Sequence, residues 1–536
     1  MSVVPPTVGD MTDDVSTVIG RHAAALALPG VLSLRPGFLL RDGVLTGTPA
    51  IVATVATVAA GSPAPALPAE IEGLPVDVRI ASERKALRLT DPAAYARLAG
   101  TSPDLGSVPE FGDEVRVMSA GVTARVEPGI PPLAVSAAAS KPQLPYTGPA
   151  GASLASVVVE GPITLSASPD TGWATLAAFL QGTASSLTIG LYDFTSAHVL
   201  AAFEKAAAGK AVTLVLDHPA KNPTADQTDE QTVAALDQAL GSSFEQAWAL
   251  ERMDPKASAW IFPTAYHMKV AVRDSKAVWL SSGNWNNSNQ PDIAPTTNPA
   301  DAAAARAGDR DWHVVVDDAG LAGVYEAFLK HDHEVAAAHN VSPTVGEVIE
   351  PAFVRPAAQT PPFTQFFPST TIAGPTTVTP LLTPDPGVYV DAVTKLVESA
   401  TTTLHLQFQY IELPKTASPA TQPFADLVAA VIARQKAGVD VKIVMSEFES
   451  AGYLEQLQSA GLDVAAAVRL QNNVHNKGMV VDGARVLVSS QNWSSAGVLS
   501  NRDAGVILES SEAAAYFDRI FLHDWQNLAT LPVQAD

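Results

Sequence analysis

Residues 266–285 of this chain read YHMKVAVRDSKAVWLSSGNW, and residues 474–493 read VHNKGMVVDGARVLVSSQNW. Seven residues (His, Lys, Asp, Ser, Ser, Asn and Trp) recur in both stretches at identical spacing. From ordinary residue frequencies, a chance repeat of this kind would arise roughly once in a million chains or less often. The pattern therefore indicates that two parts of the chain are copies of one unit.

The start of each stretch predicts a β-strand that carries reactive side chains. Residues i and i+2 of a strand lie on one face, so His267 and Lys269 are expected to point together, as are His475 and Lys477. The motif acids fall where each strand turns, and a second strand follows. These second strands are expected to return two amides to the same edge of the sheet. The turn acids are Asp274 and Asp482, and the amides belong to Asn284 and Asn492.

The elements ahead of each stretch follow one order: strand, helix, strand. The first copy has predicted strands at 187–191 and 212–216 around a helix at 199–208, and the second has strands at 404–408 and 441–445 around a helix at 424–436. Such a unit makes a right-handed crossover in a parallel sheet. We therefore predict an α/β fold in which two similar lobes pack pseudo-symmetrically around one active site.

Two imidazoles, two ammoniums and two amides around one cavity suit a phosphodiester. Its charged oxygens would be held by Lys269, Lys477, Asn284 and Asn492 through charge-assisted hydrogen bonds. We assign Ser282 and Ser490 to phosphate binding as well. One histidine attacks phosphorus, and the other protonates the leaving oxygen and later activates water. This scheme passes through a phosphohistidine and requires no metal or other cofactor.

A carboxylate behind each imidazole would fix its tautomer and stabilise its positive charge. Asp503 follows His475 by 28 residues, and Asp311 follows His267 by 44 residues, so we expect each aspartate to serve the histidine of its own copy. The 16 additional residues in the first copy fit an insertion around 290–305 that would border the substrate.

The two copies of His-x-Lys-x4-Asp-x6-Ser-Ser-x-Asn resemble the duplicated HxKxxxxD motif of the phospholipase D superfamily. Ser281 and Ser489 stand where many members have glycine, and the resemblance spans about residues 155–535. It implies two α/β lobes with one shared active site, a covalent phosphohistidine and no metal. It also implies the following roles: His267 as nucleophile, His475 as general acid, Lys269, Lys477, Asn284 and Asn492 as phosphate ligands, Asp311 and Asp503 as orienting acids, and Asp274 and Asp482 as structural acids.

Two proline-rich segments, 129–150 and 351–386, predict the domain boundaries. We expect a small N-terminal α+β domain of unknown role over 1–150 that ends in a proline-rich linker. The first lobe would span 151–350, and the second 351–536, with 351–386 as a proline-rich connection. Within the N-terminal domain we expect a helix at 12–27 and strands near 31–34, 51–58 and 76–80.

Composition restricts the partners. The 33 Lys and Arg residues against 55 Asp and Glu give a net charge of −22, so general binding to nucleic acid or anionic lipid is not expected. The chain has no cysteine, which excludes disulfides and thiolate chemistry. No transmembrane segment or signal peptide is recognisable, which favours a cytoplasmic protein with at most transient contact with a membrane surface. Since both motifs lie in one chain, a monomer suffices for a complete site.

Three other features have alternative interpretations. Trp285 and Trp493 suit a head-group site, but an aromatic residue just after a strand more often packs in the core. The run 331–334 (HDHE) has the residue types of a metal site, yet it aligns with 523–526 of the second copy, which argues against a metal. Three polar residues at predicted strand ends, Asp217, His218 and Glu447, are expected either to contact substrate or to lie in solvent.

These observations favour a phosphodiesterase of the phospholipase D type, acting on a phospholipid or a related phosphodiester, with transphosphatidylation when an alcohol replaces water. A metal-independent nuclease with the same machinery is the first alternative, since phosphate chemistry does not depend on what the ester carries. A catalytically inactive scaffold is the second.

Overall fold

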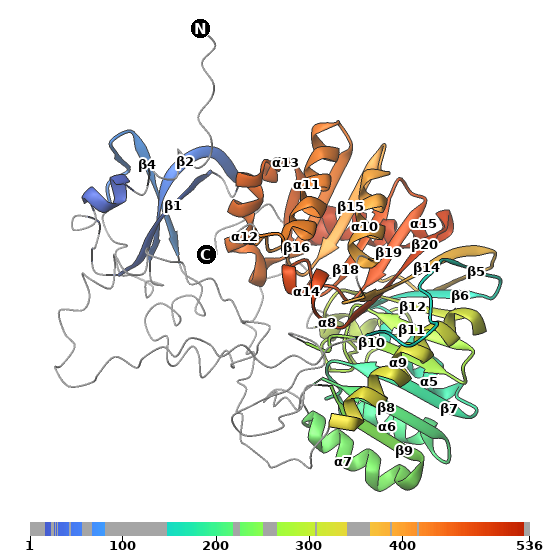
Figure 1. Ribbon diagram of the computed structural model, residues 1–536. Coiled ribbons are helices and arrows are strands. Elements are labelled where there is room, and N and C mark those ends of the chain that lie inside the picture. Colours follow the sequence, from blue (N-terminus) through green and yellow to red (C-terminus); the bar gives the residue numbers. More distant parts are fainter. Residues whose placement is uncertain are drawn as a thin grey trace, which may run out of the picture. The chain divides into compact units, whose positions relative to one another are not determined.

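The computed structural model (Figure 1) describes residues 15–55 except 16, 23–25, 27, 29, 42 and 43, and residues 67–80, 147–217, 226–249, 265–305, 308–339, 365–385, 388–414 and 418–529. The chain divides into two compact units. The first comprises Met1–Ser140, Ala451–Val468 and Leu531–Asp536, and the second comprises Lys141–Ser450 and Arg469–Thr530.

A four-stranded sheet with the order β1-β2-β4-β3 forms part of the first unit. Its strands are β1 (Val31–Arg41), β2 (Val44–Val55), β3 (Glu70–Ile71) and β4 (Leu74–Ile80). The apolar side chains of Val15, Val18, Ile19 and Leu26, all at helical positions, pack against β1 and β2 in one core. The described residues thus agree with the predicted α+β arrangement. Arg35 and Arg79 of this sheet both pair with Glu455 of α12 (Glu447–Ala460).

The second unit contains two eight-stranded sheets. The first has the order β13-β6-β12-β11-β10-β7-β8-β9. Its strands are β6 (Ile163–Ser168), β7 (Ser186–Leu191), β8 (Ala211–Leu216), β9 (Phe244–Trp248), β10 (Lys269–Arg273), β11 (Ala277–Ser281), β12 (Asp311–Asp317) and β13 (Thr370–Ile372). The helices connected to it are α5 (Gly172–Gln181), α6 (Ala197–Ala207), α7 (Asp229–Leu240), α8 (Ala302–Ala305) and α9 (Ala319–His339), with 3₁₀ turns η3 (Gly241–Ser243) and η4 (Pro299–Asp301).

The second sheet has the order β17-β16-β15-β18-β19-β20-β14-β5. Its strands are β5 (Val157–Val159), β14 (Thr376–Thr383), β15 (Thr403–Phe408), β16 (Asp440–Ser446), β17 (Val468–Gln471), β18 (Lys477–Val481), β19 (Arg485–Ser489) and β20 (Asp503–Glu509). The helices of this part of the chain are α10 (Val388–Glu398), α11 (Gln422–Lys436), α12, α13 (Val464–Ala467), α14 (Ser495–Leu499) and α15 (Ser511–His523), followed by the π-helical turn η5 (Asp524–Leu528).

Read from opposite ends, the two sheets have equivalent strand orders. The predicted parallel pairs are present as β7 with β8 and β15 with β16. The predicted α/β class is therefore confirmed, and the pseudo-symmetric relation of the lobes stays a prediction. Each sheet also contains an edge strand from the other part of the chain, because β13 pairs with β6 and β5 pairs with β14.

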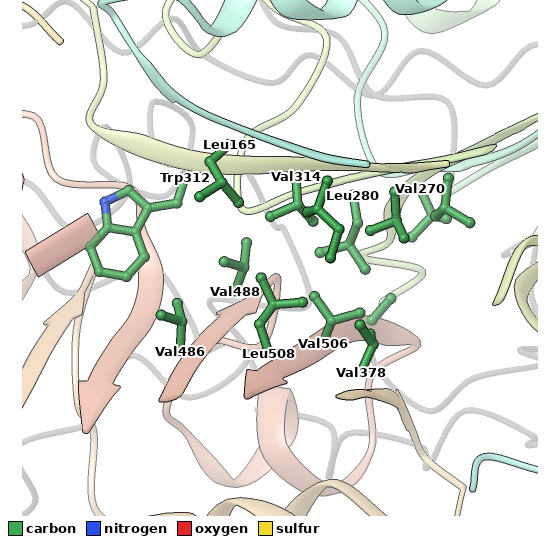
Figure 2. Packing of buried hydrophobic residues seen from close by; sticks show 14 of the residues in the cluster. Leu165, Val270, Leu280, Trp312, Val314, Val378, Val486, Val488, Val506 and Leu508 are labelled. Carbon is green, nitrogen blue, oxygen red and sulfur yellow. The ribbon is translucent and has the colours of Figure 1, made fainter. Parts of the chain in front are cut away.

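Apolar side chains of the two sheets pack against each other in a shared core (Figure 2). Leu165, Val270 and Val314 of the first sheet belong to the same buried cluster as Val488 and Val506 of the second. Burial of this apolar surface holds the two lobes together, and it fixes the edges that carry the motifs.

The domain boundaries predicted near residues 150 and 350 stay a prediction, because residues 81–146 and 340–364 lie outside the described residues. No helix in the described part of the chain combines the length and the apolar composition that a bilayer span requires.

Candidate active site

Both motif histidines lie just ahead of a strand and are fixed by the opposite lobe. The sequence predicted His267 and His475 within strands, whereas β10 begins at Lys269 and β18 begins at Lys477. The backbone N–H of His267 donates to the carbonyl of Arg502 (2.7 Å), and the N–H of His475 donates to the carbonyl of Arg310 (3.1 Å). These short parallel bridges join the two lobes beside the histidines.

Beside these bridges, the histidine of each lobe contacts the aspartate of the other lobe. Nδ1 of His267 lies 2.8 Å from Oδ1 of Asp503, and Nδ1 of His475 lies 2.9 Å from Oδ1 of Asp311. The expectation that each aspartate serves the histidine of its own copy was therefore wrong. The physical reason is that the segment ending at each aspartate runs beside the other lobe's histidine.

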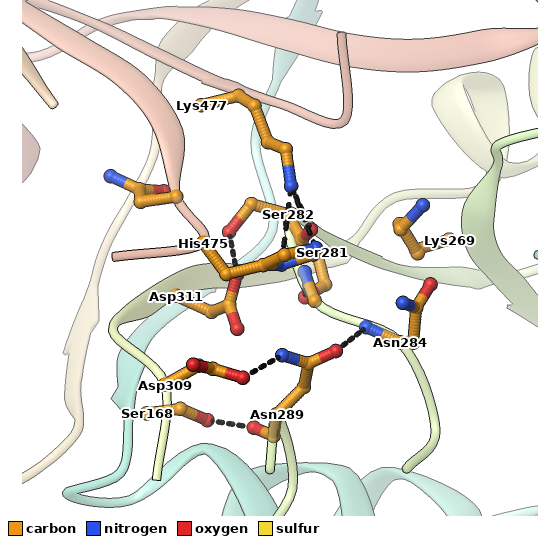
Figure 3. Close-up of polar contacts among 12 residues, drawn as sticks. Ser168, Lys269, Ser281, Ser282, Asn284, Asn289, Asp309, Asp311, His475 and Lys477 are labelled. Atoms are coloured by element: carbon orange, nitrogen blue, oxygen red, sulfur yellow. Dashed lines mark hydrogen bonds and ion pairs between the residues drawn. The ribbon is translucent and has the colours of Figure 1, made fainter. Parts of the chain in front are cut away.

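The motif serines position these carboxylates. Ser282 Oγ donates to Asp311 Oδ1 (2.7 Å; Figure 3), and Ser490 Oγ donates to Asp503 Oδ1 (2.6 Å). Both serines are fully buried, and each also accepts a backbone N–H from the strand that carries the aspartate. The structure thus differs from the predicted phosphate-binding role of these serines, because their hydroxyl protons are engaged by the aspartates.

Two fully buried lysines follow the histidines. Lys269 Nζ donates to the carbonyl of His267 (2.7 Å), and Lys477 Nζ lies 3.0 Å from Nε2 of His475. Burial lowers the pKa of Lys477 to about 8, although the charges of Asp311 and Asp503 oppose this shift. The ammonium form still predominates at neutral pH. Each imidazole is therefore accompanied by a cation that can attract a phosphate oxygen.

The electrostatic surroundings of the two imidazoles differ. Burial, followed by the charges of Lys269 and Lys477, holds the pKa of His267 well below its ordinary value, so its ring is neutral near pH 7. Burial and Lys477 also lower the pKa of His475, but Asp311 opposes them.

The pKa values of the two orienting carboxylates also differ between the two sides of the site. Burial would raise the pKa of Asp311, but the charge of His475 and its hydrogen bond hold that pKa below its usual range. Burial raises the pKa of Asp503 to about 6, against the attraction of Lys269. Positive charge is therefore better supported on the His475 side.

The two motif asparagines present amide groups at the same edge. The side-chain oxygens of Asn284 and Asn492 are buried and have no hydrogen-bond partner among the described residues. The backbone N–H of Asn284 donates to Oδ1 of Asn289 (2.9 Å), which anchors the motif to the start of the predicted insertion. Phosphate binding by Asn284 and Asn492 stays a prediction that this placement suits.

Sequence reasoning missed Tyr192, which follows β7. Its ring meets the ring of His267 edge to face, with centroids 4.8 Å apart, and Lys269 Nζ lies 5.1 Å from its centroid. Gln409 stands at the equivalent position after β15, so this position carries an aromatic ring in the first copy only. Only comparison of the two strand ends would have drawn attention to this residue.

Sequence reasoning also missed two buried arginine clamps. Arg310 binds Asp524 through two nitrogens (2.8 and 3.0 Å), and Arg502 binds Asp332 in the same way (2.8 and 2.9 Å). Both pairs join one lobe to the other. The backbone carbonyls of the two arginines are the ones that accept the N–H groups of His475 and His267. The common offset of 192 residues from Arg310 to Arg502 and from Asp332 to Asp524 was the available signal.

The remaining candidates have structural contacts. Asp332 of the 331–334 run is committed to Arg502, and within the described ranges no group of three or more His, Cys, Asp or Glu residues is arranged to bind a metal. Trp285 and Trp493 are buried in aromatic clusters, as the packing interpretation predicted. Asp217 is also buried and accepts the backbone N–H of Tyr266 (2.6 Å). His218 and the side chain of Glu447 lie outside what is described.

The motif acids hold the strand ends together. Oδ1 of Asp274 accepts the backbone N–H groups of Ser185 and Ser186, and its Oδ2 accepts that of Ala184. Asp482 receives the N–H groups of residues 401–403 in the same manner. Both acids have positive φ values, 54° and 51°, at the turns of their hairpins. These contacts are the ones a structural role requires.

Low pH should weaken the hydrogen bonds that Asp274 accepts at the strand end. Slight burial raises the pKa of Asp274, but the three N–H groups outweigh it and lower that pKa from 3.8 to about 2. A lowered folded-state pKa stabilises the fold above the ordinary pKa, and this contribution is lost as the pH falls from about 4 to about 2. Over that pH range we expect Asp274→Asn to lose less stability than the wild type, measured as urea unfolding midpoints. Asp440→Asn, at an exposed acid, is the matched control, and equal pH dependence in both variants would contradict the role.

Fold and site together define a two-lobed α/β protein with a duplicated histidine–lysine centre. Residues 393–525 match the family model described as "Cardiolipin synthase, PLD-like domain". This segment contains the second motif. The predicted resemblance to the phospholipase D superfamily is thereby confirmed over this segment.

A curated relative is the mitochondrial cardiolipin hydrolase of Danio rerio, 27% identical over 104 residues, which are 19% of this chain and 46% of that protein. The match thus spans about half the length of that relative. Two solved structures are also similar. Phosphatidylserine synthase from Haemophilus influenzae Rd KW20 shows 13% identity, covers 70% of this chain and 88% of its own, and has a TM-score of 0.45. Nuc from Salmonella typhimurium, a phospholipase D family member, shows 23% identity, covers 29% and 97%, and has a TM-score of 0.24.

Proposed function

We propose that this protein is a phosphodiesterase of the phospholipase D type, which hydrolyses a phospholipid or a related phosphodiester through a phosphohistidine. The observation that carries the proposal is the crossed pair of contacts, His267 with Asp503 and His475 with Asp311. With Nδ1 of each ring held by a buried carboxylate, Nε2 is the nitrogen that can reach a substrate.

In the first step, Nε2 of His267 attacks phosphorus. The neutral state of this ring provides the lone pair, and Asp503 stabilises the positive charge that develops on it. The bond between phosphorus and the leaving oxygen breaks, and His475 donates its proton to that oxygen. Lys269 and Lys477 neutralise the non-bridging oxygens, and Asn284 and Asn492 donate hydrogen bonds to them.

In the second step, water hydrolyses the phosphohistidine. His475, now neutral, takes a proton from the water, whose oxygen attacks phosphorus while the bond to Nε2 of His267 breaks. The released phosphomonoester leaves His267 neutral and His475 protonated, which restores the starting state. An alcohol in place of water would give a new diester by the same route.

A lipid substrate is favoured over nucleic acid. The net charge of −22 disfavours long-range attraction of a polyanion, although the two buried lysines can bind one phosphate locally. The names of the matching family and of the curated relative both refer to cardiolipin, so this diester belongs among the substrates to test.

Product analysis over a set of diesters tests the proposal. The full chain is incubated with vesicles of phosphatidylcholine, phosphatidylethanolamine or cardiolipin and, separately, with single-stranded DNA. We expect phosphatidate and the released alcohol from at least one lipid, and a phosphatidyl ester of ethanol when ethanol is added. Cleavage of DNA with all lipids intact would favour the nuclease alternative, and no cleavage of either would favour an inactive scaffold.

A further inference from the structure

The two halves of the site differ in charge beside the histidines. Arg310 and Asp311 of the first lobe correspond to Arg502 and Asp503 of the second. The residue ahead of each pair does not correspond in charge, because Asp309 stands where the second lobe has Asn501. Since Asp and Asn have nearly the same shape, this difference changes the electrostatics of the site more than its packing.

The backbone places Asp309 beside the His475 segment. The N–H of Arg310 donates to the carbonyl of Asn473 (2.7 Å), and the N–H of His475 donates to the carbonyl of Arg310 (3.1 Å). Residues two apart in extended backbone lie on one face, so Asp309 accompanies Asp311 along this bridge. The bridge thus brings two carboxylates, rather than one, to the His475 side.

Contacts from the insertion fix the additional carboxylate. Asp309 is 5% exposed, its Oδ2 accepts from Nδ2 of Asn289 (2.9 Å), and its backbone N–H donates to the carbonyl of Ser288. Oδ1 of Asn289 accepts the N–H of Asn284, so a chain of hydrogen bonds connects Asp309 with the predicted phosphate ligand (Figure 3). Asp309 is therefore a buried and hydrogen-bonded part of the site and not a solvated loop end.

The opposite side has a neutral residue in this place. Asn501 is 4% exposed, and its backbone N–H donates to the carbonyl of Ala496 (2.8 Å). The bridge that follows connects Arg502 with Tyr266, ahead of His267. Asp503 is the carboxylate that contacts His267, and the charge of Asp193 acts on both Lys269 and His475.

We propose that Asp309 is a positioning residue that assigns the two catalytic roles, because its negative charge favours the proton on His475 over His267 and leaves His267 as the nucleophile. The inference rests on the proposed function, and it adds a residue that distinguishes the two half-sites electrostatically.

The charged groups around both rings agree with this assignment. His475 is influenced by the cation of Lys477 and by the carboxylates of Asp311, Asp309 and Asp193. His267 is influenced by Lys269, Lys477 and His475, its Nδ1 contacts Asp503, and a hydrogen bond with the backbone of Ser490 opposes the lowering of its pKa. Burial and Lys477 lower the pKa of His475, and the charges of Asp311 and Asp309 oppose them. Removal of Asp309 therefore weakens protonation of His475.

A charge-exchange experiment tests the inference. The full chain, Asp309→Asn and the double variant Asp309→Asn/Asn501→Asp react with bis(p-nitrophenyl) phosphate, and the phosphohistidine is located by mass spectrometry of alkaline-quenched peptides. This substrate has two identical ester groups, so its own asymmetry cannot select the attacking ring. We expect the adduct on His267 in the wild type, on both histidines in Asp309→Asn, and on His475 in the double variant.

The pH profile gives a second readout. Loss of one nearby carboxylate should move the alkaline limb of kcat/KM to lower pH by about one unit and reduce kcat about 10-fold. Asn at position 309 can still accept the hydrogen bond of Asn289, so the fold is expected to be retained. The control is Asp237→Asn, the same change at an exposed acid of α7 outside the insertion, which should leave both readouts unaltered.

The outcomes distinguish the role of Asp309 from the proposed phosphodiesterase function. A wild type that turns over, together with variants that keep its adduct site and pH profile, would overturn the role of Asp309 and leave the proposed function standing. A wild type that neither turns over nor forms an adduct on any tested diester would overturn both.

Discussion

His267→Ala is expected to lower kcat for a phosphodiester by about 10⁴-fold or more, because it removes the atom that forms the covalent intermediate. No adduct should then form even with bis(p-nitrophenyl) phosphate, whose leaving group needs no proton. Release of p-nitrophenolate and mass spectrometry of the protein are the measurements. Substantial remaining turnover would end the phosphohistidine mechanism.

His475→Ala should fail at a different step. Because p-nitrophenolate leaves without an acid, His267 can still be phosphorylated, but no base remains to activate water. We expect a burst of about one equivalent of p-nitrophenolate followed by a stall, with the adduct accumulating on His267. The control is His331→Ala, since His331 contacts the carbonyl of Thr147 outside the site and its loss should leave turnover unchanged.

The repeated motif allowed much of the fold to be predicted from sequence. Apolar runs next to turn residues identified β7, β8, β10 and β11 and their counterparts, because strands buried in a sheet have this composition whatever surrounds them. Asp274 and Asp482 were also placed correctly at turns. These features depend on local pattern, which a single sequence contains in full.

The contacts between the lobes could not be predicted in this way. That Asp503 serves His267, and Asp311 serves His475, depends on how two distant segments align, and no periodicity encodes that alignment. The same is true of β5 and β13, which cross to the other sheet. Ser282 was misassigned for a related reason, since the partner that engages its hydroxyl lies 29 residues away.

Arg310→Ala is expected to lower the free energy of unfolding by about 3–5 kcal/mol, since removal of one partner leaves buried charges uncompensated. Its guanidinium is fully buried and binds Asp524 through two nitrogens and Asp170 through a third (3.0 Å). Asp170 and Asp524 are fully buried as well, so water cannot replace the lost cation. The control is Arg273→Ala: Asp317, the partner of Arg273, is 41% exposed, and the loss should stay within about 1 kcal/mol.

A double-mutant cycle separates charge from packing in this prediction. Arg310→Ala leaves the carboxylates of Asp170 and Asp524 without their cation. Asp524→Asn removes one of these charges, so in the Arg310→Ala background it should restore part of the lost stability. In the wild type the same change weakens a bidentate contact and should destabilise the fold. Urea midpoints of the four proteins give the coupling, and a value near zero would show that the clamp acts by packing alone. Because the carbonyl of Arg310 holds the N–H of His475, Arg310→Ala should also reduce kcat where the protein remains folded.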